Sequence, residues 1–159
     1  MGSKPSSWGS DAKSLPGSMT APGRKPAGLR DLSGGATAVT LEGAASAAAL
    51  VDDDAATALA LPARAGVAFS FAEAAKASHY TITSGKAALP HLGWTLEGRN
   101  GKGAWTVLDK RSDEAFAWER QLRPFRIAKP GAYREYRLRF TNGAAVELAE
   151  LELLAPAAQ

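Results

Sequence analysis

The residues with the clearest chemical potential are three oxygen-bearing side chains in one short acidic segment. Asp52, Asp54 and Thr57 fall within residues 52–57 of the 159-residue chain, in a stretch that predicts a tight loop. Hard oxygens on a bent backbone are what Ca²⁺ binds, usually with backbone carbonyls and a distant carboxylate completing about six to eight ligands. Glu150, in the last apolar run, can supply that carboxylate.

The acidic segment also has a simpler interpretation. Three consecutive aspartates, residues 52–54, are most often a solvated turn, because like charges repel unless water or a cation separates them. An EF-hand is excluded, since the glycine and the glutamate that such a loop needs at its sixth and twelfth positions are missing. The solvated turn and a calcium loop of another type both stay open.

A second group of residues has the composition of a sugar site. Trp118, Arg120 and Gln121 lie in a polar stretch that reads as a loop between strands. A flat indole ring can stack on the C–H face of a pyranose while polar neighbours bind its hydroxyls. The alternative is a tryptophan folded back to close one end of the fold, and both interpretations stay open. Lys86, in another loop, is expected to assist.

The sequence contains none of the common catalytic motifs. It has no cysteine, no histidine pair at metal-binding spacing and no glycine-rich phosphate loop. Glycosidase chemistry needs two carboxylates about 5 to 9.5 Å apart. The four carboxylates nearest such a role are interpreted as solvated surface groups, so we expect a protein that is not an enzyme: Asp109, Asp113, Glu114 and Glu119.

Charge and composition restrict the partners. The net charge is +3 and the pI about 9.3, but the bases are scattered, so we expect no nucleic-acid partner. No apolar stretch approaches the roughly 20 residues that span a bilayer, so we expect no membrane insertion. The first residues lack the apolar core of a secretory signal.

The elements that must position these residues are short strands. Residues 1–35 are rich in Ser, Gly, Pro and Lys and are predicted to be a disordered linker or cloning remnant. Residues 36–155 show period-two alternation punctuated by turn residues, which predicts an all-β, antiparallel, jelly-roll-like β-sandwich of about eight strands. The alternation places Trp94 and Trp105 in the core. The alternating pairs and triplets are Val67/Phe69/Phe71, Tyr80/Ile82, Trp94/Leu96, Trp105/Val107, Phe125/Ile127 and Tyr136/Leu138/Phe140.

The order of motifs in residues 36–155 resembles the discoidin, or coagulation-factor C-type, family of galactose-binding-like β-sandwich modules. The best-matching strands are Tyr-Thr-Ile-Thr-Ser at 80–84, Gly-Trp-Thr-Leu-Glu-Gly at 93–98 and Ala-Trp-Thr-Val-Leu-Asp at 104–109. Segments 125–127, 133–140 and 148–154 are similar to the last three strands. Modules with a Trp-Thr-Leu-Glu-Gly strand are familiar as appendages of large bacterial glycoside hydrolases.

The resemblance implies one structural Ca²⁺ that ties the first loop to the last strand. Carried over residue by residue, its ligands are the Ala49 and Ala149 carbonyls with Asp52, Asp54, Thr57 and Glu150. It also implies that sugar contacts come from the loop that contains His91. In binding members that loop supplies an Arg and an Asn, where Ser84 and His91 stand here. The resemblance therefore does not extend to the residues that bind galactose-like sugars.

The resulting functional prediction is a non-catalytic carbohydrate-binding module of a larger exported bacterial glycoside hydrolase. Its partners are a glycan and the catalytic domain of the parent protein, and its location is secreted, cell-surface or periplasmic. The alternative is a structural domain that packs against a catalytic domain and binds no sugar of its own. The glycan site is predicted at His91, Trp118 and Arg120, with Lys86 and Gln121 assisting.

Overall fold

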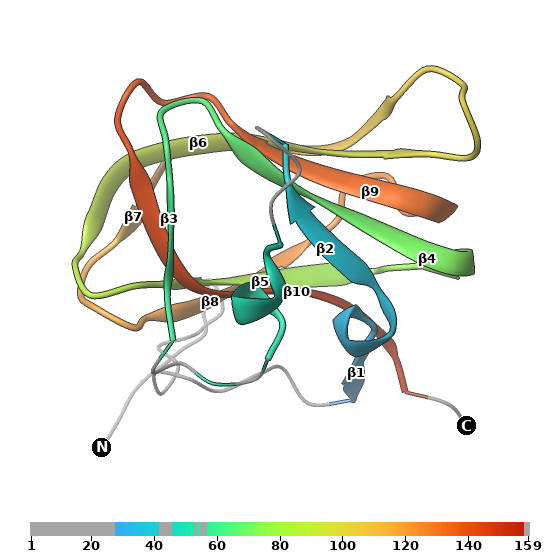
Figure 1. The fold of residues 1–159 in the computed structure, drawn as a ribbon, viewed down its shortest axis with the longest axis horizontal. Helices are drawn as coiled ribbons and strands as arrows, with labels where there is room; N and C mark the ends of the chain where they lie inside the picture. Colours follow the sequence, from blue (N-terminus) through green and yellow to red (C-terminus); the bar gives the residue numbers. More distant parts are fainter. Residues whose placement is uncertain (1–27, 42–45, 53, 55–56, 158–159) are drawn as a thin grey trace.

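Two antiparallel sheets face each other and enclose the core of the molecule (Figure 1). The computed structural model describes residues 28–41, 46–52, 54 and 57–157. The predicted all-β, antiparallel β-sandwich is confirmed, although the described residues form ten strands where about eight were expected. Their bounds are β1 Leu29–Asp31, β2 Thr37–Thr40, β3 Leu59–Leu61, β4 Gly66–Lys76, β5 His79–Ser84, β6 Leu89–Arg99, β7 Thr106–Phe116, β8 Leu122–Arg126, β9 Ala132–Phe140 and β10 Val146–Pro156.

The strand order brings distant parts of the chain together. In the first sheet the order is β1-β10-β5-β8, and β3 pairs with the start of β10. In the second sheet the order is β2-β4-β9-β6-β7. Strand β10 lies inside its sheet and is buried over most of its length. It therefore links the first described strand, β1, to the middle of the sandwich (Figure 1).

The core is built around aromatic rings from both sheets. Tyr80 on β5 and Phe125 on β8 stack with their ring centroids 5.3 Å apart. Trp94 on β6 packs edge-on against Phe125 at 5.0 Å and against Phe140 at 6.2 Å. Trp94 is fully buried, as the alternation predicted. Such pairs add about 0.5 to 1.5 kcal/mol each beyond the burial of their area, so this cluster joins the two sheets.

The predicted core position of Trp105 is wrong. Trp105 lies just before β7 and is only half-buried, and Val107 is exposed while Leu108 is buried. The β6–β7 ladder shifts register between Leu96 and Glu97. A one-residue slip moves every following side chain to the opposite face of a strand, which explains the error.

Some residues before position 36, the expected start of the module, already have regular structure. Residues 29–31 form β1, which pairs with β10, and residues 33–35 form a 3₁₀ turn. The Ser33 hydroxyl accepts a hydrogen bond from the Leu153 N–H at 2.7 Å. The sandwich thus includes residues that the composition assigned to the linker. Residues 1–27 of that predicted linker lie outside the described residues.

Candidate functional sites

The oxygens of the acidic segment converge on the Thr57 hydroxyl. The Thr57 Oγ1 lies 2.9 Å from Asp52 Oδ2, 2.8 Å from the Asp54 carbonyl oxygen and 3.3 Å from the Ala49 carbonyl oxygen. A threonine hydroxyl has one hydrogen to donate, so it cannot satisfy three acceptors at once. A concentration of oxygens that exceeds the available protons suits a hard cation.

Glu150 on β10 reaches the same point from the far end of the chain. The Asp54 N–H donates to Glu150 Oε2 at 3.1 Å and to Asp52 Oδ1 at 2.9 Å, so two carboxylates share one amide. Glu150 is only 6% exposed, and a buried carboxylate is costly without compensating charge or hydrogen bonds. Burial acts to raise the pKa of Asp52, but hydrogen bonds from the Asp54 N–H and the Thr57 hydroxyl hold that pKa below its usual value.

The two alanines of the predicted calcium set lie beside these groups. Ala49 is in a 3₁₀ turn, Ala48–Leu50, that follows an Ala-rich stretch. Ala149 is skipped by the β5–β10 pairing, because Leu148 is opposite Ser84 and Glu150 is opposite Thr83. In the described part of the chain no three His, Asp or Glu side chains gather in a metal-binding group. A cation here would therefore rely on hydroxyl and carbonyl oxygens as well as on carboxylates.

The loop that contains Trp118 is fixed to the turn after β5. The Arg120 N–H donates to the Gly85 carbonyl at 2.9 Å. The Ser84 hydroxyl donates to the Trp118 carbonyl at 2.9 Å and accepts from the Gln121 N–H at 2.9 Å. These bonds all involve main-chain atoms of residues 118–121. The loop conformation is thus held without the side chain of the tryptophan.

Trp118 itself is presented to solvent. Its exposure is 48%, and only Val107 is comparably exposed among the large hydrophobic residues of the described chain. Gln121 is partly committed to the loop, because its Oε1 accepts from the Ala117 N–H at 2.6 Å. Arg120 itself has φ +50°, a left-handed backbone conformation that is uncommon outside glycine. An exposed ring on a fixed loop is the arrangement that a sugar platform requires.

Lys86 belongs to the same end of the sandwich. Its N–H donates to Glu147 Oε1 at 2.8 Å, and the Gly85 N–H donates to the Glu147 carbonyl at 3.0 Å. A Cβ at Gly85 would lie 2.6 Å from Glu147 Oε1, so any larger residue there would require the Glu147 side chain to move. The structure thus brings together Lys86, Trp118, Arg120 and Gln121. Sequence reasoning missed Ser84 and Glu147, the residues that join the two loops.

His91, near the start of β6, makes its hydrogen bond to a different partner, on β7. Its Nδ1 is 2.5 Å from Asp113 Oδ1 on β7, and both side chains are largely exposed. His91 and Asp113 both have positive φ, +52° and +57°, at irregularities in the β6–β7 ladder. A left-handed backbone at a ladder irregularity changes the direction of the side chain, and here both the imidazole and the carboxylate are exposed to solvent. No sequence signal connected these two residues.

One of the four carboxylates interpreted as solvated is in fact buried. Asp109 is 5% exposed, accepts from the Tyr80 hydroxyl at 2.5 Å and pairs with Arg111 at 2.9 Å. The Trp94 Nε1–H donates to the Tyr80 hydroxyl at 2.7 Å, which connects the carboxylate to the aromatic core. Burial, and then the bond to Asp109, raise the pKa of Tyr80. The Arg111 guanidinium also donates to the Arg126 carbonyl at 2.9 Å, across the edges of the two sheets.

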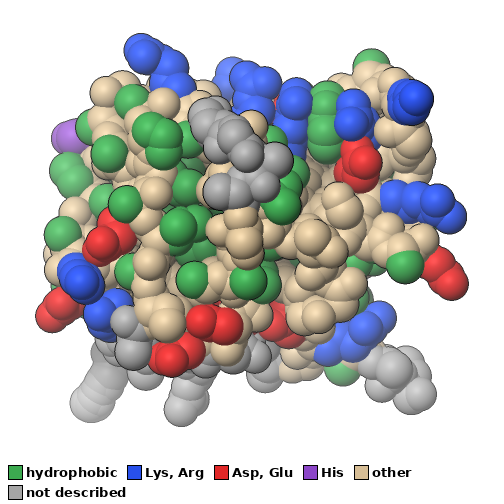
Figure 2. Space-filling view, in the orientation of Figure 1, with side chains coloured by type: hydrophobic (Ala, Val, Ile, Leu, Met, Phe, Trp, Pro, Cys, Tyr) green, Lys and Arg blue, Asp and Glu red, His purple; other side chains and the backbone are tan. Residues whose placement is uncertain are grey.

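Charged side chains are unevenly distributed over the surface. In Figure 2 many of the lysines and arginines lie along the upper side, whereas most of the acidic residues lie in the middle and lower part. Arg99 pairs with Glu135, and Arg137 pairs with Glu97, each at 2.5 Å. Both guanidiniums also stack on the Trp105 ring, 4.3 and 4.2 Å from its centroid. The tryptophan that was expected in the core is thus part of a cation–π cluster.

In the described residues no helix is long and apolar enough to cross a membrane.

Comparisons with known proteins confirm the predicted resemblance at the level of the fold. The sequence matches no protein-family profile and no curated protein. The structure is similar to a family 32 carbohydrate-binding module from Clostridium perfringens NanJ in complex with galactose, with a TM-score of 0.62 and 16% identity over 80% of this chain and 99% of that one. It is similar to an F5/8 type C domain from Bacteroides fragilis, with a TM-score of 0.67 and 12% identity over 84% and 100% of the two chains. A chitosan-binding module from a Paenibacillus chitosanase/glucanase gives a TM-score of 0.60 and 14% identity over 79% and 98%.

Proposed function

We propose that this discoidin-like domain is a non-catalytic carbohydrate-binding module, and that its glycan site is the surface around Trp118. The observation that carries the proposal is an exposed indole on a loop whose backbone is anchored to Ser84 and Gly85. A loop whose backbone is already fixed loses little conformational freedom when a sugar stacks on the ring that it carries. Similar modules are solved with galactose or are described as chitosan-binding, which supports a glycan as the ligand.

The polar part of the site comes from the neighbouring side chains. Arg120 offers a planar fork of donors to adjacent hydroxyls. With His91 Nδ1 directed at Asp113, the other ring nitrogen is available for a hydroxyl. Lys86 and the amide nitrogen of Gln121 complete the proposed set. Their bonds compete with water, so we expect a Kd of about 10 μM to 1 mM, or about 4 to 7 kcal/mol.

A glycan array probed with the intact chain tests the proposal. We expect binding to a restricted group of saccharides, followed by a calorimetric Kd in the range given above. An array without any signal, together with self-association of the domain or binding of an apolar dye, would instead favour the alternative of a domain that packs against a catalytic partner. The larger glycoside hydrolase and its export are further parts of the proposal.

The acidic loop is proposed to hold one structural Ca²⁺. Asp52, Asp54, Thr57 and Glu150, with the Ala49 and Ala149 carbonyls, would be its ligands. The shortage of protons around Thr57 Oγ1 and the two carboxylates that share the Asp54 N–H support this assignment. When bound, the ion supplies positive charge that offsets the burial of Glu150 and joins the acidic loop to β10.

Removal of calcium is expected to lower the melting temperature. A ligand that binds only the folded state at a hundredfold excess over its Kd adds about 2.7 kcal/mol. For a domain of this size that corresponds to a fall of about 5 to 10 °C on addition of a chelator, measured by scanning calorimetry. Glu150→Gln should abolish the response to chelator, whereas Glu73→Gln, an exposed carboxylate on β4, should keep it. An identical melting temperature with calcium and with chelator would contradict the assignment.

A further inference from the structure

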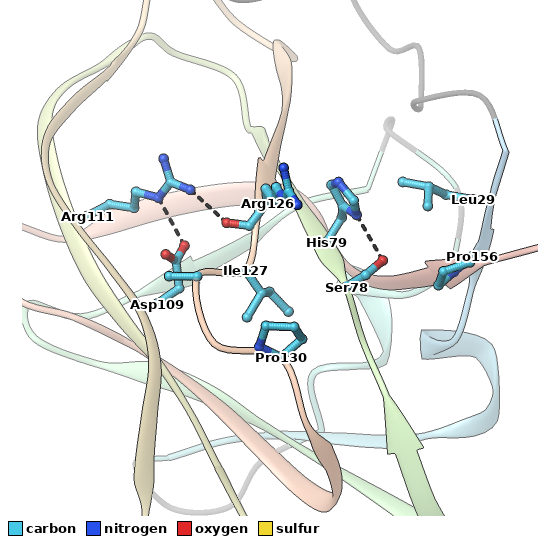
Figure 3. A pocket seen from close by; sticks show the side chains of 10 residues that line it. Leu29, Ser78, His79, Asp109, Arg111, Arg126, Ile127, Pro130 and Pro156 are labelled. Atoms are coloured by element: carbon cyan, nitrogen blue, oxygen red, sulfur yellow. Dashed lines mark hydrogen bonds and ion pairs between the residues drawn. The ribbon is translucent and has the colours of Figure 1, made fainter.

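A cleft opens at the end of the sandwich opposite the Trp118 loop. It lies beside His79 at the start of β5, whereas Ser84 at the other end of the same strand anchors that loop. Its volume is about 690 Å³, and its walls come from β1, β5, β7, β8 and β10 (Figure 3). The proposed calcium loop and the proposed sugar platform contribute no residue to it.

Two basic side chains of the cleft face each other without an opposite charge between them. His79 is directly opposite Arg126 in the β5–β8 ladder, where Cβ atoms are about 5 Å apart (Figure 3). Arg126 makes no ion pair within the described part of the chain. Arg111, by contrast, is neutralised by Asp109 and fixed by the Arg126 carbonyl. When His79 is protonated, the two side chains are like charges directly opposite each other, which destabilises a ladder, and a bound anion would relieve that repulsion.

The surroundings strengthen the positive potential. A second cavity of about 690 Å³ shares Ser78, Pro130 and Pro156 with the cleft and is also lined by Arg30 and Lys76. Counting both cavities, four permanent cations, Arg30, Lys76, Arg111 and Arg126, are balanced by one lining carboxylate, Asp109. A concave surface with charge of one sign concentrates ligands of the opposite sign.

The remaining lining is apolar. Leu29, Ile127, Pro130 and Pro156 border the charged residues (Figure 3). A cleft with an apolar wall and convergent polar groups suits a small molecule better than a bare ion. We propose that this cleft is a second ligand site, which binds an oxyanion group between Arg126 and His79. The group can belong to an acidic sugar or to a free inorganic ion, and the proposal does not depend on the sugar platform.

His79 gives the site a dependence on pH. Burial, and next the Arg126 charge, lower the pKa of His79, so the imidazole is mainly neutral at pH 7. The other groups around it are the Ser78 hydroxyl on Nδ1 at 2.9 Å, Leu154 on β10, and the Arg111–Asp109 pair. Asp31, one strand beyond Leu154, accepts from the Ser33 N–H. A bound oxyanion favours the protonated imidazole, so affinity should rise as pH falls through the pKa of His79.

Titration calorimetry of the full chain with galacturonate, sulfate and galactose tests the proposal. We expect galacturonate to bind and Arg126→Gln to weaken it by about tenfold or more, the effect of losing one charge-assisted hydrogen bond. Arg139→Gln, at an arginine on β9 that is also exposed, should leave the Kd unchanged. His79→Gln should remove the pH dependence. Sulfate binding as tight as that of galacturonate would identify a free anion as the ligand, and weaker sulfate binding would identify the acidic sugar.

The same measurements distinguish the proposed cleft site from the proposed sugar platform at the other end of the sandwich. Arg126→Gln should not change binding of neutral glycans, and Trp118→Ala should not change binding of galacturonate. The proposal is overturned if Arg126→Gln binds galacturonate as the parent does, or if Trp118→Ala abolishes that binding. In the second case the acid binds on the sugar platform. An array without any glycan signal would contradict the proposed function, but it would not contradict the proposal of an anion site in the cleft.

Discussion

Replacing Asp109 with alanine should lower the free energy of unfolding by about 3 to 5 kcal/mol. This is a larger effect than we expect for Asp113, Glu114 or Glu119, the other carboxylates interpreted as solvated from the sequence. Asp109 is 5% exposed and accepts hydrogen bonds from Tyr80 and Arg111. Its removal leaves the Arg111 charge without a counterion and the Tyr80 hydroxyl without its acceptor. A buried group that loses its partner costs its full desolvation energy, which exceeds the net value of the bond.

The free energy of unfolding of Asp109→Ala is measured by denaturant titration, and Glu119→Ala serves as the matched control. Glu119 is an exposed carboxylate only ten residues further along, so its replacement should stay within about 0.5 kcal/mol of the parent. Tyr80→Phe should fall between the two, at about 1 to 3 kcal/mol, because it deprives Asp109 and the Trp94 Nε1–H of one bond each. Equal stability of the two alanine variants would mean that Asp109 is solvated, as the sequence alone suggested.

The error about Trp105 shows where reasoning from period-two alternation stops. Alternation correctly buried Trp94, since β6 and β9 pair without a shift from Trp94 to Arg99. It misplaced Trp105 because the β6–β7 ladder is irregular, and a bulge leaves no local mark in the sequence. Asp109 was interpreted as solvated from its residue type, and its burial depends on contacts with Tyr80 and Arg111. Strand existence follows from local composition, whereas the direction of a side chain depends on a partner strand.

The site residues fall into two groups, those that the sequence identifies and those that depend on contacts between distant segments. The acidic segment and Glu150 could be predicted from the sequence because side-chain chemistry and motif order identify them, and the structure places them together. Ser84 and Glu147 could not be predicted, since they act on main-chain atoms of loops 34 and 61 residues away in sequence. Asp113 was noted only as a carboxylate, because its contact with His91 exists only through pairing of β6 with β7.

Replacing Trp118 with alanine should abolish measurable glycan binding while the melting temperature stays nearly unchanged. The indole is 48% exposed, so its removal leaves no internal cavity. The bonds that fix its loop use the Trp118 carbonyl and the Arg120 N–H, and alanine preserves them. A residue that anchors a ligand typically contributes about 2 kcal/mol or more, which corresponds to at least about a thirtyfold loss of affinity. That loss moves a Kd that starts near 1 mM beyond detection.

Val107→Ala is the matched control for the loss of exposed apolar surface. Val107 is 46% exposed and lies at the far end of β7 from the Trp118 loop, so its replacement should leave glycan binding intact. Calorimetric titration with the best saccharide from the array, together with a thermal scan, distinguishes the outcomes. If Trp118→Ala unfolds the domain, or folds normally and binds glycan as before, the ring is not the platform. A selective loss of binding at constant stability is expected only of a side chain that touches the sugar, because the loop keeps its shape without it.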